Sequence, residues 1–279
     1  MELEFFVCNW LTLDRIGTDL LATTQEVAER FNIQPLMSDS VLPTIIVPAR
    51  LASSRFPSKL LADAGGKPLI LRTAERIRDQ APEFDLIFAV DGEELSDILQ
   101  KAGFSSIKTS PDLPSGTDRI AQANESLGKD LIINIQADEP MVLREHILAL
   151  TEGLSKENAD LSTLAVPFLS PEDIRDPNQV KVVLDRMGFA LYFSRSPIPY
   201  DRTIEHGISN AALKHLGMYG YRNTFLKKFS AMEQGVLENM EKLEQLRALE
   251  MGFKIAVQFV RNGTIGVDTR EDLDKIDFS

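Results

Sequence analysis

The sequence predicts an α/β fold in which helices cover both faces of a Rossmann-like, mostly parallel sheet. Short apolar runs rich in β-branched residues alternate along the chain with stretches of helical period, as in such a sheet. Turns with glycine, proline or serine follow most of the apolar runs. The 279 residues, 43% of them hydrophobic, fit one large α/β domain or two small ones. Since parallel strands end at one edge of the sheet, we expect ligands to bind at that edge.

The first half of the chain alternates regularly from Thr44 onward. Strands are predicted at Thr44–Val47, Leu86–Val90, Ile107–Thr109 and Leu131–Ile135. Helices are predicted at Pro68–Gln80, at Glu93–Ala102, and from Ser115 or Thr117 to Leu127. Pro68 suits a first helical position, and Gly103 suits the end of a helix. The alternation is typical of parallel strands joined by crossover helices.

The second half is less regular. Strands are predicted at Leu161–Phe168, Val180–Asp185, Ala190–Ser194, Leu216–Tyr221 and Ile255–Val260. Helices are predicted at Asn223–Phe229, Leu237–Gly252 and Arg270–Ile276. A turn at Met187 and Gly188 indicates a hairpin. We expect the antiparallel stretch at about 180–221 to be an inserted arm that makes a dimer contact.

Residues 1–43 are expected to be an N-terminal extension of unknown role, outside the catalytic domain at 44–279. Thr23 and Glu26 form a plausible capping box, and Val27 and Phe31 then lie on one helical face. No basic recognition helix follows, so a helix that packs or contacts a partner is expected rather than a DNA reader.

The totals exclude several classes of protein. The formal net charge of -12 argues against general nucleic-acid binding, which needs a basic face. The single cysteine excludes an internal disulfide and a multi-cysteine metal site. No apolar run approaches the roughly 18 residues that a membrane span needs. The start of the chain lacks the basic region of a secretory signal, so a cytoplasmic protein is expected.

The stretch Thr44–Leu61 carries the first chemical signal. An apolar strand runs there into a loop with clustered cationic and hydroxyl side chains: Arg50, Ser53, Ser54, Arg55, Ser58 and Lys59. Such a loop can hold a polyphosphate through fixed cations and hydrogen-bond donors. On local composition alone, a solvated basic loop is an equally good interpretation.

Two aspartates add the parts of a metal-assisted phosphoryl or nucleotidyl transfer. Asp138 follows the predicted strand Leu131–Ile135, and Asp268 follows the last predicted strand in a glycine-flanked turn. Carboxylates at strand ends can converge on Mg²⁺, which bridges to substrate phosphates. Each aspartate could instead cap the helix that follows it. The turn Ser115–Arg119 opens another helix and could hold an anion or a base edge. No Walker loop, GxGxxG or GxSxG motif is present.

The chain from Thr44 to its C-terminus resembles the 3-deoxy-manno-octulosonate cytidylyltransferases, which have the nucleotide-diphospho-sugar transferase fold. The resemblance rests on separated motifs in one order: PARLASSRFPSK at 48–59, SGTDRI at 115–120, INIQADEP at 133–140, KHLGMYGYR at 214–222 and GVDTREDL at 266–273. It implies transfer of CMP from CTP to the anomeric hydroxyl of 3-deoxy-D-manno-octulosonate (Kdo), with release of pyrophosphate, for lipopolysaccharide synthesis. It also implies a homodimer.

The resemblance implies a role for individual residues. The nucleotide would contact Ala49, Arg50, Ser53, Lys59, Ser115, Gly116 and Thr117. The sugar acid would contact Arg55, Gln136, Arg195, His215, Tyr219, Glu244 and Gln245. Asp138 and Asp268 match the magnesium-binding aspartates, and with Lys59 they form the implied catalytic set.

The chain departs from the family pattern where Ala137 replaces the usual glycine and Val90 the usual threonine. Two other functions stay open at this point. One is a cytidylyltransferase for a related acid sugar, such as 8-amino-Kdo or a nonulosonate. The other is a catalytically silent nucleotide-binding protein, which retention of both aspartates and Lys59 disfavours.

Overall fold

The computed structural model describes residues 42–52, 56–203 and 212–278. The chain divides into two compact units, Met1–Val41 and Leu42–Ser279. The first unit, with the helix expected near Thr23, lies outside the described residues, as do Ser53, Ser54 and Arg55 in the basic loop. The following description therefore concerns the second unit.

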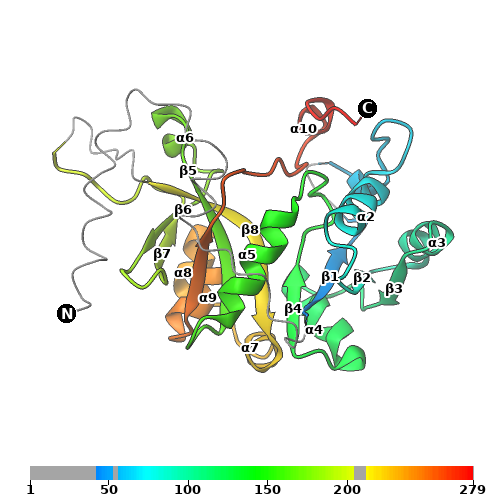
Figure 1. Cartoon of the computed structure of the whole chain (residues 1–279), viewed down its shortest axis with the longest axis horizontal. Coiled ribbons are helices and arrows are strands. Elements are labelled where there is room, and N and C mark those ends of the chain that lie inside the picture. The colour runs from blue at the N-terminus through cyan, green and yellow to red at the C-terminus, as the bar shows by residue number, and fades with distance from the viewer. Residues whose placement is uncertain (1–41, 53–55, 204–211, 279) are drawn as a thin grey trace. The chain divides into compact units, whose positions relative to one another are not determined.

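The sheet of this unit is built on four parallel strands (Figure 1). They are β1 (Thr44–Ala49), β2 (Leu86–Val90), β3 (Ser105–Lys108) and β4 (Leu131–Asn134). They lie in the order β3-β2-β1-β4. The chain therefore adds β2 and β3 on one side of β1 and then places β4 on the other side of β1. In folds of this kind, ligands bind outside the carboxyl ends of the strands at which the strand order reverses, here β1 and β4.

One long antiparallel strand continues the sheet beyond β4. This strand, β8 (Leu213–Arg222), lies between β4 and β5 (Leu161–Pro167), and β5 pairs in parallel with β9 (Ile255–Phe259). The strands β6 (Lys181–Leu184) and β7 (Ala190–Ser194) form the predicted hairpin, which pairs with the first residues of β8. Within the stretch expected to be an arm, at about 180–221, the hairpin lies off the main strand order, whereas most of β8 is an inner strand between β4 and β5. The dimer contact expected of this stretch stays a prediction.

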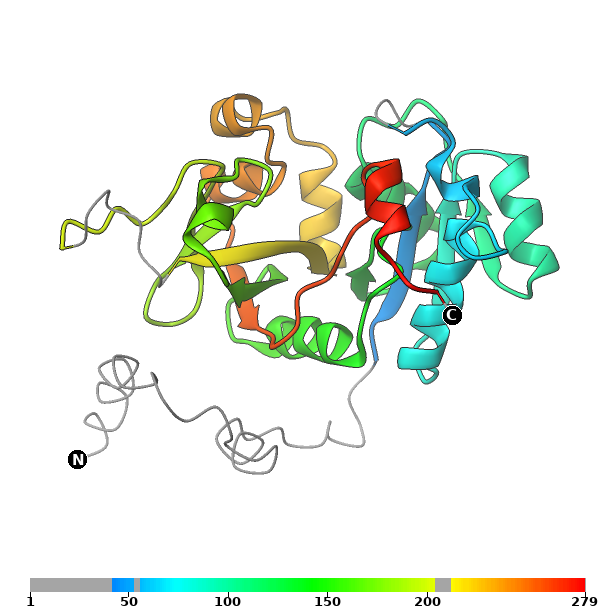
Figure 2. The same cartoon turned by 90° about the horizontal axis from the view of Figure 1, so that it is seen from above.

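Helices cover both faces of the sheet, as the sequence predicted (Figure 2). Alternate residues of β1 show the two layers, because successive side chains of a strand point to opposite faces. Ile45 and Val47 pack in one core with α2 (Leu69–Gln80), α3 (Glu93–Lys101) and α5 (Arg144–Ser155). Ile46 packs in the other core with α4 (Gly116–Leu127), α7 (Asn223–Phe229) and α9 (Gln245–Glu250).

Several elements differ from the sequence prediction. Strand β1 continues through Pro48, which pairs with Ala89, instead of ending at Val47. Helix α5 was not predicted. The single helix expected at Leu237–Gly252 is two short helices, α8 (Val236–Glu241) and α9, because Lys242 takes a left-handed conformation with φ 54°. The remaining short helices are η2 (Lys59–Leu61), α6 (Pro171–Arg175) and α10 (Arg270–Asp274).

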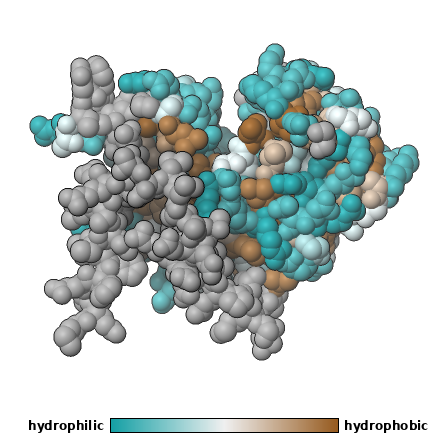
Figure 3. Space-filling model, turned by 45° about the horizontal axis from the view of Figure 1, so that its top comes forward, coloured by the Kyte–Doolittle hydropathy of each residue, from teal (hydrophilic) through white to brown (hydrophobic). Residues whose placement is uncertain are grey.

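Helices of the described residues are all too short or too polar to cross a membrane. The surface is hollowed at the edge that carries the ends of β1 and β4, between the side with α6 and the side with α10 (Figure 3).

Candidate active site

Lys59 joins segments that are far apart in the sequence. It lies in the single turn η2, and its Nζ donates hydrogen bonds to the Asp138 carboxylate and, at 2.8 Å, to the carbonyl oxygen of Val267. The same Nζ lies 3.6 Å from Asp268 Oδ1. The expectation that Asp138 and Asp268 converge beside the basic loop is therefore met.

Asp268 reaches this place by a different route from the one expected. Strand β9 ends at Phe259, so Asp268 is not at a strand end, and a segment without helix or strand leads from β9 to it. The amide of Val267 donates to the carbonyl oxygen of Asp138 at 2.9 Å. Gly266 permits this approach, because a Cβ there would lie 2.8 Å from Glu139 Oε1.

Glu139 is a buried carboxyl group beside these two aspartates that sequence reasoning missed. Its Oε2 atom is buried and has no hydrogen-bond partner among the described residues. Burial, and then the charge of Asp138, raise the pKa of Glu139 to about 7. The signal was present in the sequence, since Glu139 lies inside the motif that carries Asp138.

The carboxylates fit a magnesium site that is completed by substrate. No cluster of three or more His, Cys, Asp or Glu in the described part of the chain is arranged to hold a metal ion unaided. Mg²⁺ in phosphoryl-transfer sites needs only one or two protein carboxylates, because phosphate oxygens and waters supply its other ligands. Asp138 and Asp268, drawn together on Lys59, are a donor set of that kind.

The loop after β1 is held by a second carboxylate that sequence reasoning missed. Ala49 is buried at the end of β1, and the exposed Arg50 follows it. The amide of Leu51 donates to both carboxylate oxygens of Asp91, at 3.3 and 3.1 Å. Asp91 follows β2, the strand next to β1, so two neighbouring strand ends fix the start of the loop.

The Ser115–Gly116–Thr117 turn begins α4 at the same edge. Ser115 is the N-cap, and its Oγ accepts a hydrogen bond from the Asp118 amide at 3.1 Å. A Cβ on Gly116 would lie 3.3 Å from Pro48 Cγ and 3.8 Å from Gln136 Oε1. The turn therefore packs on the end of β1 and beside Gln136.

Ala137, where the family has glycine, fits without backbone strain. Non-glycine residues with positive φ in the described ranges are Ser58, Asn158 and Lys242, so Ala137 has an ordinary conformation. Its side chain is buried, and its carbonyl oxygen accepts from Thr73 Oγ1 at 2.9 Å. The methyl group is therefore accommodated within the packed base of the site.

Glu244 and Gln245 line a small cavity next to the Ser115 turn. Its volume is about 20 Å³, and its other walls include Thr117, Tyr219 and Tyr221. The Ser115 hydroxyl lies 3.1 Å from Glu244 Oε1, and burial raises the pKa of Glu244. Gln245 Nε2 is buried without a partner among the described residues. An unused hydrogen-bond donor such as Gln245 Nε2, in the wall of a cavity, is what a polar ligand needs.

His215 and Arg195, the other two predicted sugar contacts in the described part, lie toward β7 and the first half of β8. His215 is buried, and its Nε2 lies 2.9 Å from Thr163 Oγ1. Phe193, two residues before Arg195, packs edge-on against the His215 ring, with centroids 4.9 Å apart.

The Arg195 guanidinium donates to the main chain rather than to another predicted site residue. Its acceptors are the carbonyl oxygens of Glu241 at 2.6 Å, Pro177 at 2.9 Å and Lys242 at 3.3 Å. Glu241 also accepts from the Arg195 amide at 2.9 Å. No sequence pattern pointed to Glu241, because the sequence predicted one continuous helix there and no break at Lys242.

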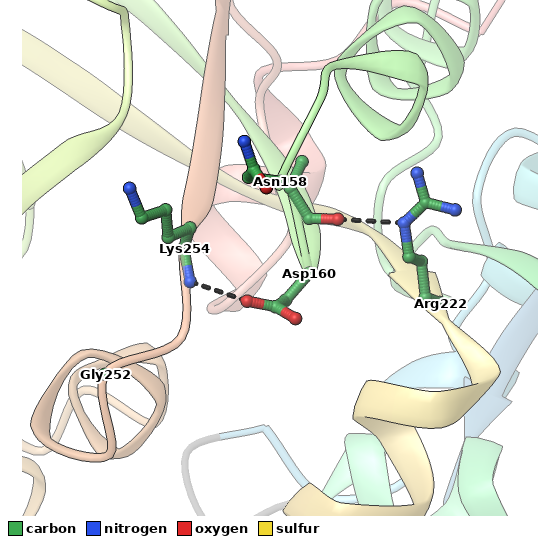
Figure 4. Close-up of a pocket in the computed structure, with 6 residues that line it drawn as sticks. Asn158, Asp160, Arg222, Gly252 and Lys254 are labelled. Atoms are coloured by element: carbon green, nitrogen blue, oxygen red, sulfur yellow. Dashed lines mark hydrogen bonds between the residues drawn. The ribbon is translucent and has the colours of Figure 1, made fainter.

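A larger surface depression lies elsewhere and is not part of this site. Its volume is about 660 Å³, and it is lined by Asn158, Ala159, Asp160, Arg222, Gly252 and Lys254 (Figure 4). Asp160 precedes β5, so the depression is at the end of that strand opposite to Pro167. Arg222 donates to Ala159 O at 2.8 Å, and Lys254 N donates to Asp160 at 2.9 Å. These groups join chain segments to one another.

Comparison with known proteins gives one consistent result. The sequence model of the cytidylyltransferase family matches residues 44–255. A 3-deoxy-manno-octulosonate cytidylyltransferase of Chlorobium phaeobacteroides is 43% identical over 236 residues, which cover 83% of this chain and 94% of that protein. One of Chloroherpeton thalassium is 41% identical over 235 residues, which cover 83% of this chain and 95% of that protein.

Solved structures agree with the sequence relatives. A CMP:2-keto-3-deoxy-manno-octonic acid synthetase complexed with CTP has a TM-score of 0.78 and 37% identity, covering 84% of this chain and 96% of that chain. A 4-diphosphocytidyl-2C-methyl-D-erythritol synthase from Anaerococcus prevotii, 16% identical with a TM-score of 0.54, covers 83% of this chain and 95% of that chain. This last likeness concerns the fold alone.

Proposed function

This chain belongs to the cytidylyltransferase family, among the 3-deoxy-manno-octulosonate cytidylyltransferases, and from that membership we infer its reaction. It transfers CMP from CTP to Kdo and releases pyrophosphate. The observation that carries this function is the similarity to a synthetase solved with CTP, together with the meeting of Lys59, Asp138 and Asp268 at the carboxyl edge of the sheet. The first is a likeness of the whole domain, and the second is a local arrangement of charges.

We propose a division of roles at the nucleotide end. Arg50 and Lys59 neutralise the triphosphate, and the Ser115–Gly116–Thr117 turn receives the base. The close approach of Gly116 to Pro48 supports this placement, because a Cβ there would lie 3.3 Å from Pro48 Cγ and would fill the space beside the strand end. Ser53 would contact the nucleotide as well, a role that stays a prediction.

The chemical step is a displacement at the α-phosphorus of CTP. The anomeric hydroxyl oxygen of Kdo forms the new bond to phosphorus, its proton leaves to solvent, and the bond from phosphorus to the pyrophosphate oxygen breaks. A bound Mg²⁺ would polarise the phosphate and neutralise the developing charge. Asp138 and Asp268 would hold it, and Lys59 would stabilise the same charge from the protein side.

We propose that the sugar acid lies between Gln136 and the Tyr219, Glu244 and Gln245 cavity. The cavity supports this proposal through the buried, unpartnered Gln245 Nε2 and the buried Glu244 carboxyl group. Arg55, Arg195 and His215 complete the proposed set. An arginine suits the Kdo carboxylate because its planar fork can make two parallel hydrogen bonds. For Arg195 to bind the sugar acid, its guanidinium would have to exchange its present hydrogen bonds to main-chain carbonyl oxygens for hydrogen bonds to the sugar.

Pyrophosphate release tests the assignment. The full chain is incubated with CTP, Mg²⁺ and one acid sugar at a time, and pyrophosphate is followed by a coupled assay. We expect release with Kdo. Release with 8-amino-Kdo or a nonulosonate but none with Kdo would select a related sugar. No release with any sugar, despite CTP binding, would identify a silent nucleotide-binding protein.

Magnesium dependence, the homodimer and a cytoplasmic location are further proposals that rest on the family resemblance. Chelation by EDTA should abolish turnover, and added Mg²⁺ should restore it. The role of the extension is tested by deleting residues 1–36. Unchanged activity and oligomer size after this deletion would exclude a functional role.

A further inference from the structure

Thr163 and His215 meet in the most irregular part of the pairing between β5 and β8. Thr163 is opposite Tyr219, whereas the next residue, Leu164, is opposite Leu216. Gly217 and Met218 are therefore extra residues that bulge from β8. Bulges beside active sites re-aim side chains. This bulge separates His215 from Tyr219, the two residues of β8 that the proposed function assigns to the sugar.

The Thr163 hydroxyl is held by this bulge. Its Oγ1 lies 2.8 Å from the Met218 carbonyl oxygen and 3.2 Å from the Leu216 carbonyl oxygen. A hydroxyl has one proton, and a carbonyl oxygen can only accept. The Thr163 hydroxyl therefore donates its one proton to the carbonyl oxygens of the bulge. Toward a third partner, its oxygen can only accept a hydrogen bond.

That third partner is His215, whose Nε2 lies 2.9 Å from Thr163 Oγ1. Since Thr163 accepts in this contact, Nε2 must carry the ring hydrogen. The ring is fixed on two other sides, with its centroid 4.9 Å from that of Phe193 and 5.5 Å from that of Tyr219. Burial lowers the pKa of His215 to about 3, so the ring is neutral near pH 7.

A neutral ring with its hydrogen on Nε2 has a lone pair on Nδ1. None of the hydrogen bonds among the described residues uses Nδ1 of His215. We propose that Thr163 is a positioning residue that locks His215 in the Nε2–H tautomer, so that Nδ1 accepts a hydrogen bond from a hydroxyl of the sugar acid. The identity of the sugar rests on the proposed function, whereas the tautomer does not.

The tautomer is measurable in the unmodified chain. The protein has only three histidines, so a two-bond ¹H–¹⁵N spectrum of histidine-labelled protein at pH 7.5 is simple to assign. His215 is identified by the signals lost in His215→Asn. We expect its Nδ1 at the position of an unprotonated ring nitrogen and its Nε2 at that of a protonated one. A hydrogen on Nδ1 would overturn the inference.

Addition of Kdo tests the acceptor role in the same sample. A hydroxyl that donates to Nδ1 should move this nitrogen signal to lower frequency, while the tautomer stays the same. If wild-type enzyme turns over Kdo and the Nδ1 signal does not move, the acceptor role is wrong. If the tautomer is as expected but no turnover with Kdo occurs, the proposed function fails and the local assignment stands.

Paired variants test the positioning role. Thr163→Ser keeps the hydroxyl and should leave the KM for Kdo within about twofold of wild type. Thr163→Val removes the hydroxyl and should raise the KM for Kdo about tenfold, which is the effect expected from the loss of one hydrogen bond. The kcat and the KM for CTP should change little. The Val variant should also show Nδ1–H signal from His215.

Thr151→Val is the matched control, because that buried hydroxyl donates to Ile147 O within α5 and makes no hydrogen bond to a histidine among the described residues. It should change neither KM. Equal KM values for Kdo in Thr163→Val and Thr163→Ser would overturn the positioning role. Should the Val variant not fold, Thr163→Ala takes its place, and the wild-type spectra still decide the tautomer and the acceptor role.

Discussion

Lys59 is the residue on which the proposed chemistry depends most directly, because it contacts two carboxylates from distant parts of the chain. Its side chain is 14% exposed, against 24% for Asp138 and 53% for Asp268. The more buried Asp138 is therefore the better test of the metal assignment, since removing its charge changes the site and little of the surrounding surface.

We predict that Asp138→Asn lowers turnover at least about 100-fold while the fold survives, because the amide cannot replace an anionic oxygen ligand of Mg²⁺. Pyrophosphate release at several Mg²⁺ concentrations measures the loss, and circular dichroism checks the fold. Asp85→Asn is the control, since Asp85 forms an exposed ion pair with Lys129 at 3.0 Å. Substantial Mg²⁺-dependent activity in Asp138→Asn would refute the assignment.

His146 makes stability depend on pH in a definable direction. Its Nδ1 accepts from the Leu143 amide at 3.1 Å, and its Nε2 bonds Asn262 O at 2.8 Å, so the neutral ring is built into the start of α5. Burial lowers the pKa of His146 below 6.5. In the folded state the ring stays neutral while the unfolded chain takes up a proton, so its contribution is complete above pH 6.5 and is lost as pH falls.

We predict that His146→Gln, which can keep both hydrogen bonds without titrating, loses less stability than wild type between pH 7.5 and pH 5. Urea unfolding at the two pH values measures the difference. The comparison of variants is needed because Glu139, whose pKa is raised to about 7, adds stability as pH falls and opposes the histidine. Identical pH dependence in both proteins would contradict the prediction.

At the scale of elements, the close packing of α5 on β8 depends on a glycine. A Cβ at Gly220 would lie 2.4 Å from Ser162 Oγ and 2.9 Å from Leu154 Cδ1. At Gly217, in the bulge of the same strand, a Cβ would meet no atom within 4 Å. The two glycines therefore form a matched pair.

We predict that Gly220→Ala destabilises the fold by about 1–3 kcal/mol through overpacking, whereas Gly217→Ala stays within about 0.5 kcal/mol of wild type. Urea unfolding curves at pH 7.5 measure both. Equal stability of the two variants would show that the interface between α5 and β8 is looser than described.

The elements that sequence reasoning recovered are those with strong local signals. Strand β2 and helix α7 have the predicted bounds, and Ser115 caps α4 as its sequence suggested. Helix α5 was missed although its apolar residues repeat at helical spacing. The break at Lys242 could not be predicted, because tertiary contacts hold it: the Arg195 guanidinium donates to the carbonyl oxygens of both Glu241 and Lys242.

The site shows the same division between local and distant signals. Asp138 and Lys59 could be found from the sequence, because each lies in or beside a strand-end motif. Asp91 and Glu241 could not, because each is recognised only by hydrogen bonds from groups far away in the sequence. Asp91 accepts from the Leu51 amide, and Glu241 accepts from the Arg195 amide and the Ser194 hydroxyl. A carboxylate that accepts a hydrogen bond from a group far away in the sequence produces no recognisable spacing of residues. A sequence pattern therefore cannot reveal its role.

At the scale of the whole molecule, the β6–β7 hairpin is the proposed dimer contact. Met187 and Leu191 on it are 69% and 61% exposed, which is unusual for large apolar side chains on one hairpin. We predict that Leu191→Asp shifts a dimer toward monomer in light scattering. Met251→Asp, at a residue 60% exposed beyond α9, should leave the mass unchanged. A monomeric wild type, or an unchanged Leu191→Asp dimer, would remove the hairpin from the interface.

The net charge of -12 repels the substrates at long range, since CTP and Kdo are both anions. Lys59 is paired with Asp138 and Asp268, so the exposed Arg50 at the end of β1 is the cation that can guide the nucleotide despite the acidic total. Binding of CTP should consequently weaken as salt rises, and most of this dependence should vanish in Arg50→Gln.

The central claim is that this chain joins CMP to Kdo. The most direct measurement is ³¹P NMR of the full chain with CTP, Kdo and Mg²⁺. We predict that the three CTP signals decline together while one phosphodiester signal and one pyrophosphate signal grow in equal molar amounts. Persistence of the CTP signals, or hydrolysis to CMP that does not depend on Kdo, would contradict the claim.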